Sequence, residues 1–176
     1  RSTQGVSSAA SDVYKRQYED RVNSTNNKKL KDNFKVTLII CSIAAAMDPE
    51  NEKGNDKLQE ISIESGMSLG LQIETEEVPA LMSEVDDLLN NLEDKKTEEY
   101  MEQTVKNMSD DERMVVIYNA YRIMNADNVI TEDEKGLLDS LLSEYNYSLE
   151  DVIEKGENEG FDLDSIFEGL GLDLDD

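Results

Sequence analysis

The sequence has no histidine, no tryptophan and a single cysteine, Cys41, among its 176 residues. Without histidine, neither a Cys–His pair nor a Ser–His–Asp triad can form, and these are common arrangements for nucleophilic catalysis. Zinc sites built from cysteine and histidine are excluded as well. One cysteine cannot form a disulfide within the chain. The metal ions that remain are hard cations such as Ca²⁺ and Mg²⁺, which bind carboxylate and carbonyl oxygens.

Basic residues are also scarce, because 17 lysines and arginines stand against 41 aspartates and glutamates and leave a net charge of −24. A surface this negative repels phosphate groups, so we expect no nucleic acid partner and no direct binding to an anionic membrane. The charge favours divalent cations and basic proteins as partners. A protein that imitates the charge pattern of a nucleic acid is an alternative.

Aromatic residues make up only 6% of the chain. This weighs against a glycosidase with paired carboxylates, because sugar sites usually contain aromatic platforms. Length and composition are those of one globular domain. We therefore predict a soluble, cytoplasmic, non-enzymatic binding protein. An enzyme that uses pairs of acids with Mg²⁺ is the remaining catalytic alternative.

The N-terminal residues do not resemble the rest of the sequence. Residues 7–17 read SSAASDVYKRQ, and Asp12 to Gln17 are the translation of GATGTGTATAAGAGACAG, the end of a common transposon-based sequencing adapter. We predict that residues 1–17 are a translated adapter and not natural protein. The first methionine is Met47, so we expect the natural N-terminus and any targeting signal to be missing. Residues 18–32 are polar and are predicted to form a leader or the frayed start of a helix.

An apolar stretch, FKVTLIICSIAAAM, follows from Phe34 to Met47. Its apolar residues recur at helical spacing and occupy most of the other positions too, which predicts a core helix buried on most sides. The lysines at 28, 29 and 31 give the same stretch the look of a secretory signal, which is the alternative. It is too short to span a membrane.

The rest of the chain predicts further helices and no strands. Ser109 with Glu112 and Thr131 with Glu134 form capping boxes, and each opens a helix with an apolar face. A helix is also predicted over 75–93, with Pro79 in its first turn, over 97–108 and over 149–154. The fold class is therefore all-α. Acidic turns at Asp48 and Asp127 suggest two pseudo-repeated helix–acidic turn–helix units around a shared core.

The second acidic turn reads ADNVITEDE, residues 126–134. This resembles the A-D-G-x-I-x-x-x-E pattern of the TerB-like family of tellurite-resistance domains, which are helical and of similar size. Asp127, Ile130 and Glu134 match the pattern, while Asn128 replaces the glycine, an exchange that left-handed backbone angles tolerate. The first turn keeps only Asp48. The resemblance extends over the predicted domain, residues 33–155.

The resemblance implies a stress-response protein that binds a divalent cation. It assigns Asp127 and Glu134, with Asp48 as a third residue, as metal ligands for Ca²⁺ or Mg²⁺. A loop aspartate and a carboxylate one turn into the next helix can converge on such an ion. The alternative is that Thr131 and Glu134 only cap the helix, while Asp127 makes local hydrogen bonds.

Residues 156–176 form a separate C-terminal segment. Gly156 to Gly160 loosens the chain, and FDLDSIFEGLGLDLDD then alternates apolar and acidic residues. One interpretation is a tail that docks on a basic partner protein, which makes the protein a helical adaptor without a metal site. The other is a final short helix that folds back onto the domain.

Overall fold

The computed structural model describes residues 27–159, and these form helices joined by short turns, with no strand in that range. The predicted all-α class is confirmed. The first described helix covers residues 27–46. It is followed by α2 (Glu52–Gly70), the 3₁₀ turn η1 (Thr75–Glu77), α3 (Val78–Leu89), α4 (Lys95–Asn107), α5 (Asp110–Met124), α6 (Glu132–Glu144) and α7 (Leu149–Glu159).

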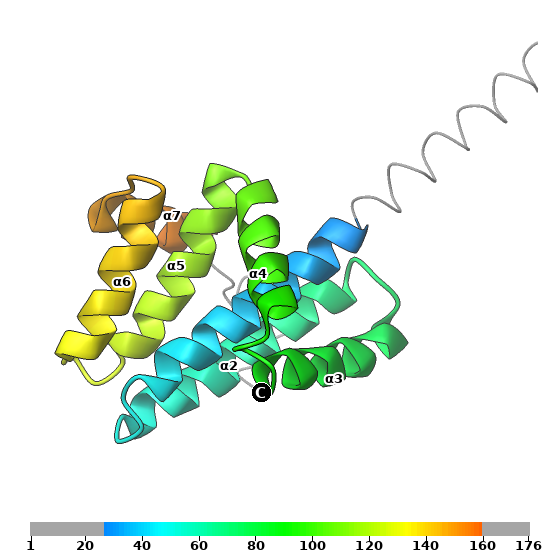
Figure 1. Ribbon diagram of the computed structural model, residues 1–176, viewed down its shortest axis with the longest axis horizontal. Coiled ribbons are helices and arrows are strands. Elements are labelled where there is room, and N and C mark those ends of the chain that lie inside the picture. Colours follow the sequence, from blue (N-terminus) through cyan, green and yellow to red (C-terminus); the bar gives the residue numbers. More distant parts are fainter. Residues whose placement is uncertain (1–26, 160–176) are drawn as a thin grey trace, which may run out of the picture.

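The helix over 27–46 runs through the middle of the molecule. Figure 1 shows it in blue and cyan, with α5, α6 and α7 to one side and α3 to the other. Its residues contribute to two apolar clusters. The first cluster joins it to α2, α5, α6 and α7 through side chains such as Val36, Ile61 and Ile123. The second joins it to α2 and α3 through Phe34 and Leu81, among others.

The apolar stretch from Phe34 therefore forms the core helix that its pattern predicts. Eight of its apolar side chains are buried: Phe34, Val36, Leu38, Ile39, Ile40, Cys41, Ala44 and Ala45. Burial raises the pKa of the Cys41 thiol to about 12. A thiol that stays protonated at neutral pH is a poor nucleophile, so Cys41 acts as a small core residue.

This helix begins earlier than the sequence pattern suggests. Residues 27–32, which lie in the segment predicted to be a leader or the frayed start of a helix, are helical. Leu30 packs against the second apolar cluster, and the Asp32 carboxylate accepts a hydrogen bond of 2.7 Å from the Tyr100 hydroxyl of α4. These contacts join residues far apart in the sequence, so the local polar pattern gives no sign of them. Residues 27–32 therefore belong to the helix, and residues 18–26 of the predicted leader lie outside the described residues.

The last described helix is also longer than predicted. The chain does not loosen at Gly156, because α7 continues to Glu159 and Gly156 is buried inside it. A Cβ atom at this position would overlap the ring of Tyr118 on α5. Glycine therefore lets α7 pack directly against an aromatic ring of α5. As a result, α7 continues past residue 155, where the sequence predicts the domain to end.

Two helical glycines provide a direct test of this packing. We expect Gly156→Ala to lower the free energy of unfolding by about 1–3 kcal/mol, because the new methyl group overpacks the contact with Tyr118. A methyl group added at Gly136 of α6 would meet no neighbouring side chain or helix within 4 Å, so this position serves as the control. Gly136→Ala should stabilise the protein by roughly 0.5–1 kcal/mol through helix propensity. Urea unfolding measures both, and a stabilising Gly156→Ala would contradict the packing.

A buried polar cluster lies between α2 and α5. Glu64 is only 2% exposed, and its Oε2 lies 3.6 Å from Nη1 of Arg122. The same nitrogen donates a hydrogen bond of 3.0 Å to Oδ1 of Asn119. Glu64 Oε2, Ser65 Oγ and Asn119 Nδ2 have no hydrogen-bond partner in the described part of the chain. Burial raises the pKa of the Glu64 carboxyl, and the Arg122 charge opposes this only in part.

The raised pKa predicts how stability depends on pH. In the unfolded chain Glu64 titrates near its ordinary value of 4.5. Burial disfavours the charged carboxylate in the folded state. The stability that the protonated Glu64 contributes is therefore lost as pH rises through the pKa of the folded state. We expect wild type to lose stability relative to Glu64→Gln between pH 4.5 and pH 7. Urea unfolding of both proteins across this range measures the difference, and a difference independent of pH would refute the assignment.

Candidate binding groove

The predicted metal ligand Glu134 forms hydrogen bonds at the start of α6. Its Oε1 accepts a hydrogen bond of 3.0 Å from the backbone N–H of Thr131, and the Thr131 hydroxyl accepts one of 3.2 Å from the backbone N–H of Glu134. Both halves of the predicted capping box are therefore present. The Glu134 side chain is 1% exposed. Capping alone accounts for a glutamate at this position.

The predicted ligand Asp127 also makes a local bond, since its Oδ1 accepts a hydrogen bond of 3.0 Å from the backbone N–H of Val129. Asn128 has a φ of 62°, which confirms that it takes the left-handed conformation expected where the family motif has glycine. Asp48 lies half-buried in the turn before α2. Between residues 27 and 159, no three or more cysteine, aspartate or glutamate side chains gather so that they could hold a metal ion. The assignment of Asp127, Glu134 and Asp48 as ligands of a divalent cation therefore stays a prediction.

Thermal unfolding separates capping from cation binding. We expect Thr131→Ala to cost about 1 kcal/mol, because α6 loses its N-cap. Glutamine also serves in a capping box, so the double variant Asp127→Asn, Glu134→Gln should lose less. Ca²⁺ and Mg²⁺, compared with EDTA at matched ionic strength, should shift the midpoints of wild type and double variant equally. A Ca²⁺-dependent rise seen in wild type alone would establish a cation site at these acids.

A groove lies between α4 and α6, and we call it the α4–α6 groove. Its volume is about 230 Å³. The base is formed by the helix over 27–46 and by α5. Apolar side chains from these four helices and from Met108, which follows α4, line it: Ile40, Ile43, Met101, Val105, Met108, Val116, Ile117, Leu137 and Leu141. The polar members are Glu102, Arg113, Glu144 and Tyr145.

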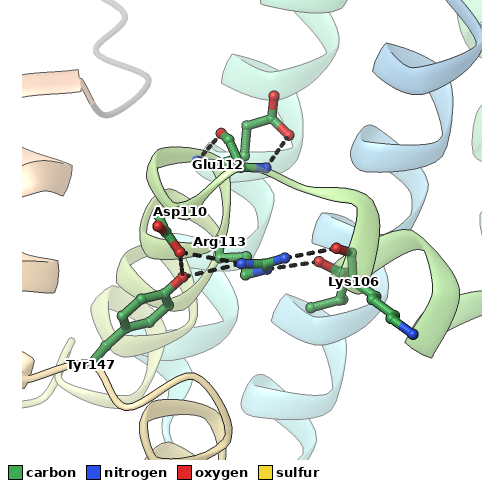
Figure 2. A network of polar contacts seen from close by, with 7 residues as sticks. Lys106, Asp110, Glu112, Arg113 and Tyr147 are labelled. Carbon is green, nitrogen blue, oxygen red and sulfur yellow. Dashed lines mark hydrogen bonds and ion pairs between the residues drawn. The ribbon is translucent and has the colours of Figure 1, made fainter.

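Arg113 of α5 holds one wall of this groove in place. Figure 2 shows its guanidinium between the end of α4 and Tyr147. Its Nε donates to the carbonyl oxygen of Val105 at 2.9 Å and its Nη2 to that of Lys106 at 2.7 Å, and both carbonyls lie in the last turn of α4. The Val105 oxygen also accepts a hydrogen bond of 3.2 Å from the backbone N–H of Met108. Nη1 lies 3.2 Å from Oδ1 of Asp110. Arg113 therefore fixes the end of α4 against the start of α5.

Two aromatic rings complete this wall. The Tyr147 hydroxyl donates a hydrogen bond to Asp110 and accepts one of 3.4 Å from Nη1 of Arg113, an interaction that raises the pKa of Arg113. Cζ of Arg113 lies 4.2 Å from the centre of the Tyr145 ring. The positive charge of Arg113 is thus used within the protein, by carbonyl oxygens, a carboxylate and an aromatic face.

The rim of the α4–α6 groove is acidic. Glu102 of α4 and Glu144 of α6 line it, and both side chains are exposed. Both carboxylates are close enough to Tyr145 to help raise the pKa of its hydroxyl, after the larger effect of burial. Neither glutamate forms an ion pair with a residue of the described chain. The groove therefore combines an apolar base with uncompensated negative charge at its edge.

The sequence pattern indicated only part of this groove. Leu137 and Leu141 belong to the predicted apolar face of α6, and the structure places them half-buried beside the groove. Arg113, Glu102 and Glu144 were missed. Their role depends on α4 and α6 meeting across α5, and charged residues are so common in this chain that these three do not stand out. One signal was available for Arg113. It follows closely after the helix predicted over 97–108, and basic side chains can donate hydrogen bonds to the last carbonyls of a helix.

Comparison of the chain with protein-family models, with curated proteins and with solved structures finds no match. The TerB-like resemblance therefore stays a prediction made from the motif at residues 126–134. Over residues 27–159, none of the helices combines the length and the hydrophobicity that crossing a membrane requires.

Proposed function

We propose that the protein is a non-enzymatic, acidic helical module that binds a basic amphipathic segment of a partner protein in the α4–α6 groove. One observation carries the proposal. An apolar groove opens between Glu102 and Glu144, whose charges are uncompensated, while the arginine that lines it is bonded internally. A segment that buries apolar side chains in the groove can place lysines or arginines at both edges.

The size and lining of the groove suit a peptide better than a small molecule. Its volume of about 230 Å³ is below the roughly 300–1,000 Å³ of typical small-molecule sites. It has room for the anchoring side chains of a helix, which dock at spacings of i, i+3, i+4 and i+7. Met101 and Met108 are flexible and polarisable, so they can adapt to anchors of different shape.

The overall charge supports the same choice of partner. A net charge of −24 raises the rate at which a basic segment meets the protein, and it opposes acidic partners. Exposed rim charges act mainly on the association rate and on salt dependence, while buried apolar anchors slow dissociation. A basic segment without apolar anchors would therefore bind this surface only weakly and would be released by salt.

A synthetic amphipathic helix of leucine and lysine tests the proposal. We expect Glu102→Lys, Glu144→Lys to weaken its binding roughly tenfold or more, because the rim then repels lysine. The matched control is Asp86→Lys, Asp87→Lys, which makes the same charge change at two exposed positions of α3. This control should weaken binding by less than about threefold. Fluorescence anisotropy at 0.15 M salt measures both dissociation constants.

A second peptide separates the groove from general charge attraction. It has the same composition, but its leucines are placed so that no apolar face forms. We expect it to bind wild type weakly and to lose that binding as salt rises. Equal binding of both peptides, or equal weakening by the two double variants, would show that the acidic surface attracts lysine without using the groove.

A further inference from the structure

A second groove has different chemistry and lies between the helix over 27–46, α2 and the start of α5. We call it the Ser65 groove, and its volume is about 280 Å³. Its apolar side chains come from all three helices and from Met108, which follows the last residue of α4: Leu30, Phe34, Leu69, Met108, Val115 and Val116. Ser65 also lines it, although it is only 4% exposed, and its hydroxyl has no hydrogen-bond partner within residues 27–159. A buried hydroxyl without a partner is costly, so this groove lacks a polar contact that an occupant would supply.

The acids of the Ser65 groove are compensated, unlike those of the α4–α6 groove. The Glu112 carboxylate lies 3.2 Å from Nζ of Lys29 and accepts a hydrogen bond of 3.1 Å from Nδ2 of Asn33. Asp111 lies 3.1 Å from Nζ of Lys155 on α7. Lys28 is exposed on the same first turn as Lys29. This part of a strongly acidic protein therefore accepts an acidic segment more readily than a basic one.

The end of α7 brings the following residues within reach of this groove. Lys155 of α7 contacts Asp111 of α5, which lines the groove. Gly156 of α7 packs on Tyr118, which also belongs to α5. The residues after Glu159 number 17, from 160 to 176. An extended chain covers roughly 3.3 Å per residue, so a segment of this length that starts five residues after Lys155 is long enough to reach the groove.

The composition of residues 160–176 fits what the groove offers. The segment contains Phe161, Leu163, Ile166, Phe167 and Leu170 as large apolar side chains, together with six acids and no lysine or arginine. We propose that this C-terminal segment docks in the Ser65 groove of its own chain, with apolar side chains against Phe34, Leu69 and Val116 and a polar group bonded to Ser65. Its acids then lie near Lys28 and Lys29. A tethered segment has an effective concentration in the millimolar range, which favours it over a free competitor.

Cysteine labelling in the full chain tests this docking. Ser68 lines the Ser65 groove, whereas Ser62 lies on the same helix but lines a separate groove toward α3. Each is replaced by cysteine in turn, and the rate of reaction with a soluble thiol reagent is measured. Cys41 is fully buried and contributes little background. The tail variant is Phe161→Ser, Ile166→Ser, Phe167→Ser, and its conservative counterpart has leucine at the same positions.

We expect the serine tail variant to speed labelling of Ser68→Cys roughly tenfold or more, because the groove is uncovered, and to leave Ser62→Cys unchanged. The leucine variant should keep the protection. Protection in the wild-type tail should not depend on protein concentration. Equal labelling rates with both tails would overturn the proposal, as would a parallel rise at Ser62→Cys. Protection that is lost on dilution would also overturn it, because the occupant would then be a second copy of the chain.

Discussion

The burial of the helix over 27–46 between two apolar clusters is the constraint on which the other helices depend. Because Val36 and Ile40 face the first cluster while Phe34 and Leu38 face the second, helices must cover this helix on both sides. With α2 alongside, α5 can pack only toward one side and α3 only toward the other. Both grooves lie where this coverage is incomplete, since residues of the central helix form the base of each.

The same helix also carries much of the charge compensation in an acidic protein. Lys29 pairs with Glu112 of α5, Lys31 with Glu77 of η1 and Lys35 with Glu84 of α3. Each exposed ion pair adds little stability. Their distribution matters more, because lysines next to the Ser65 groove reduce the repulsion of an acidic segment there. The α4–α6 groove has no such neighbours among its lining residues, and its one arginine is engaged with carbonyl oxygens.

Local signals in the sequence predicted local structure well. Both capping boxes are formed, Pro79 lies in the first turn of α3, and Asn128 takes positive φ, since each depends on residues a few positions apart. The helical character of residues 27–32, the length of α7 and both grooves depend on contacts between distant residues. Gly156 illustrates the limit, because its neighbour Tyr118 is far away in the sequence. A glycine that loosens the chain and a glycine that allows close helix packing look the same in the sequence. The two cases are distinguished only when the residue packed against the glycine is known.

The metal prediction illustrates a second limit, which comes from composition. The chain has 41 acids, and capping favours negative side chains in the first turn of a helix, so a motif of aspartate and glutamate does not by itself distinguish capping from cation binding. Glu134 satisfies the N-cap backbone of α6, and Asp127 satisfies the backbone of its own turn. These bonds use one oxygen of each carboxylate, and within residues 27–159 no third acidic side chain joins them in a group that could hold a cation. In so acidic a protein, specificity for a binding partner must therefore come from sites where an apolar surface lies next to a particular arrangement of charge. The two grooves are such sites, and their rims differ in charge.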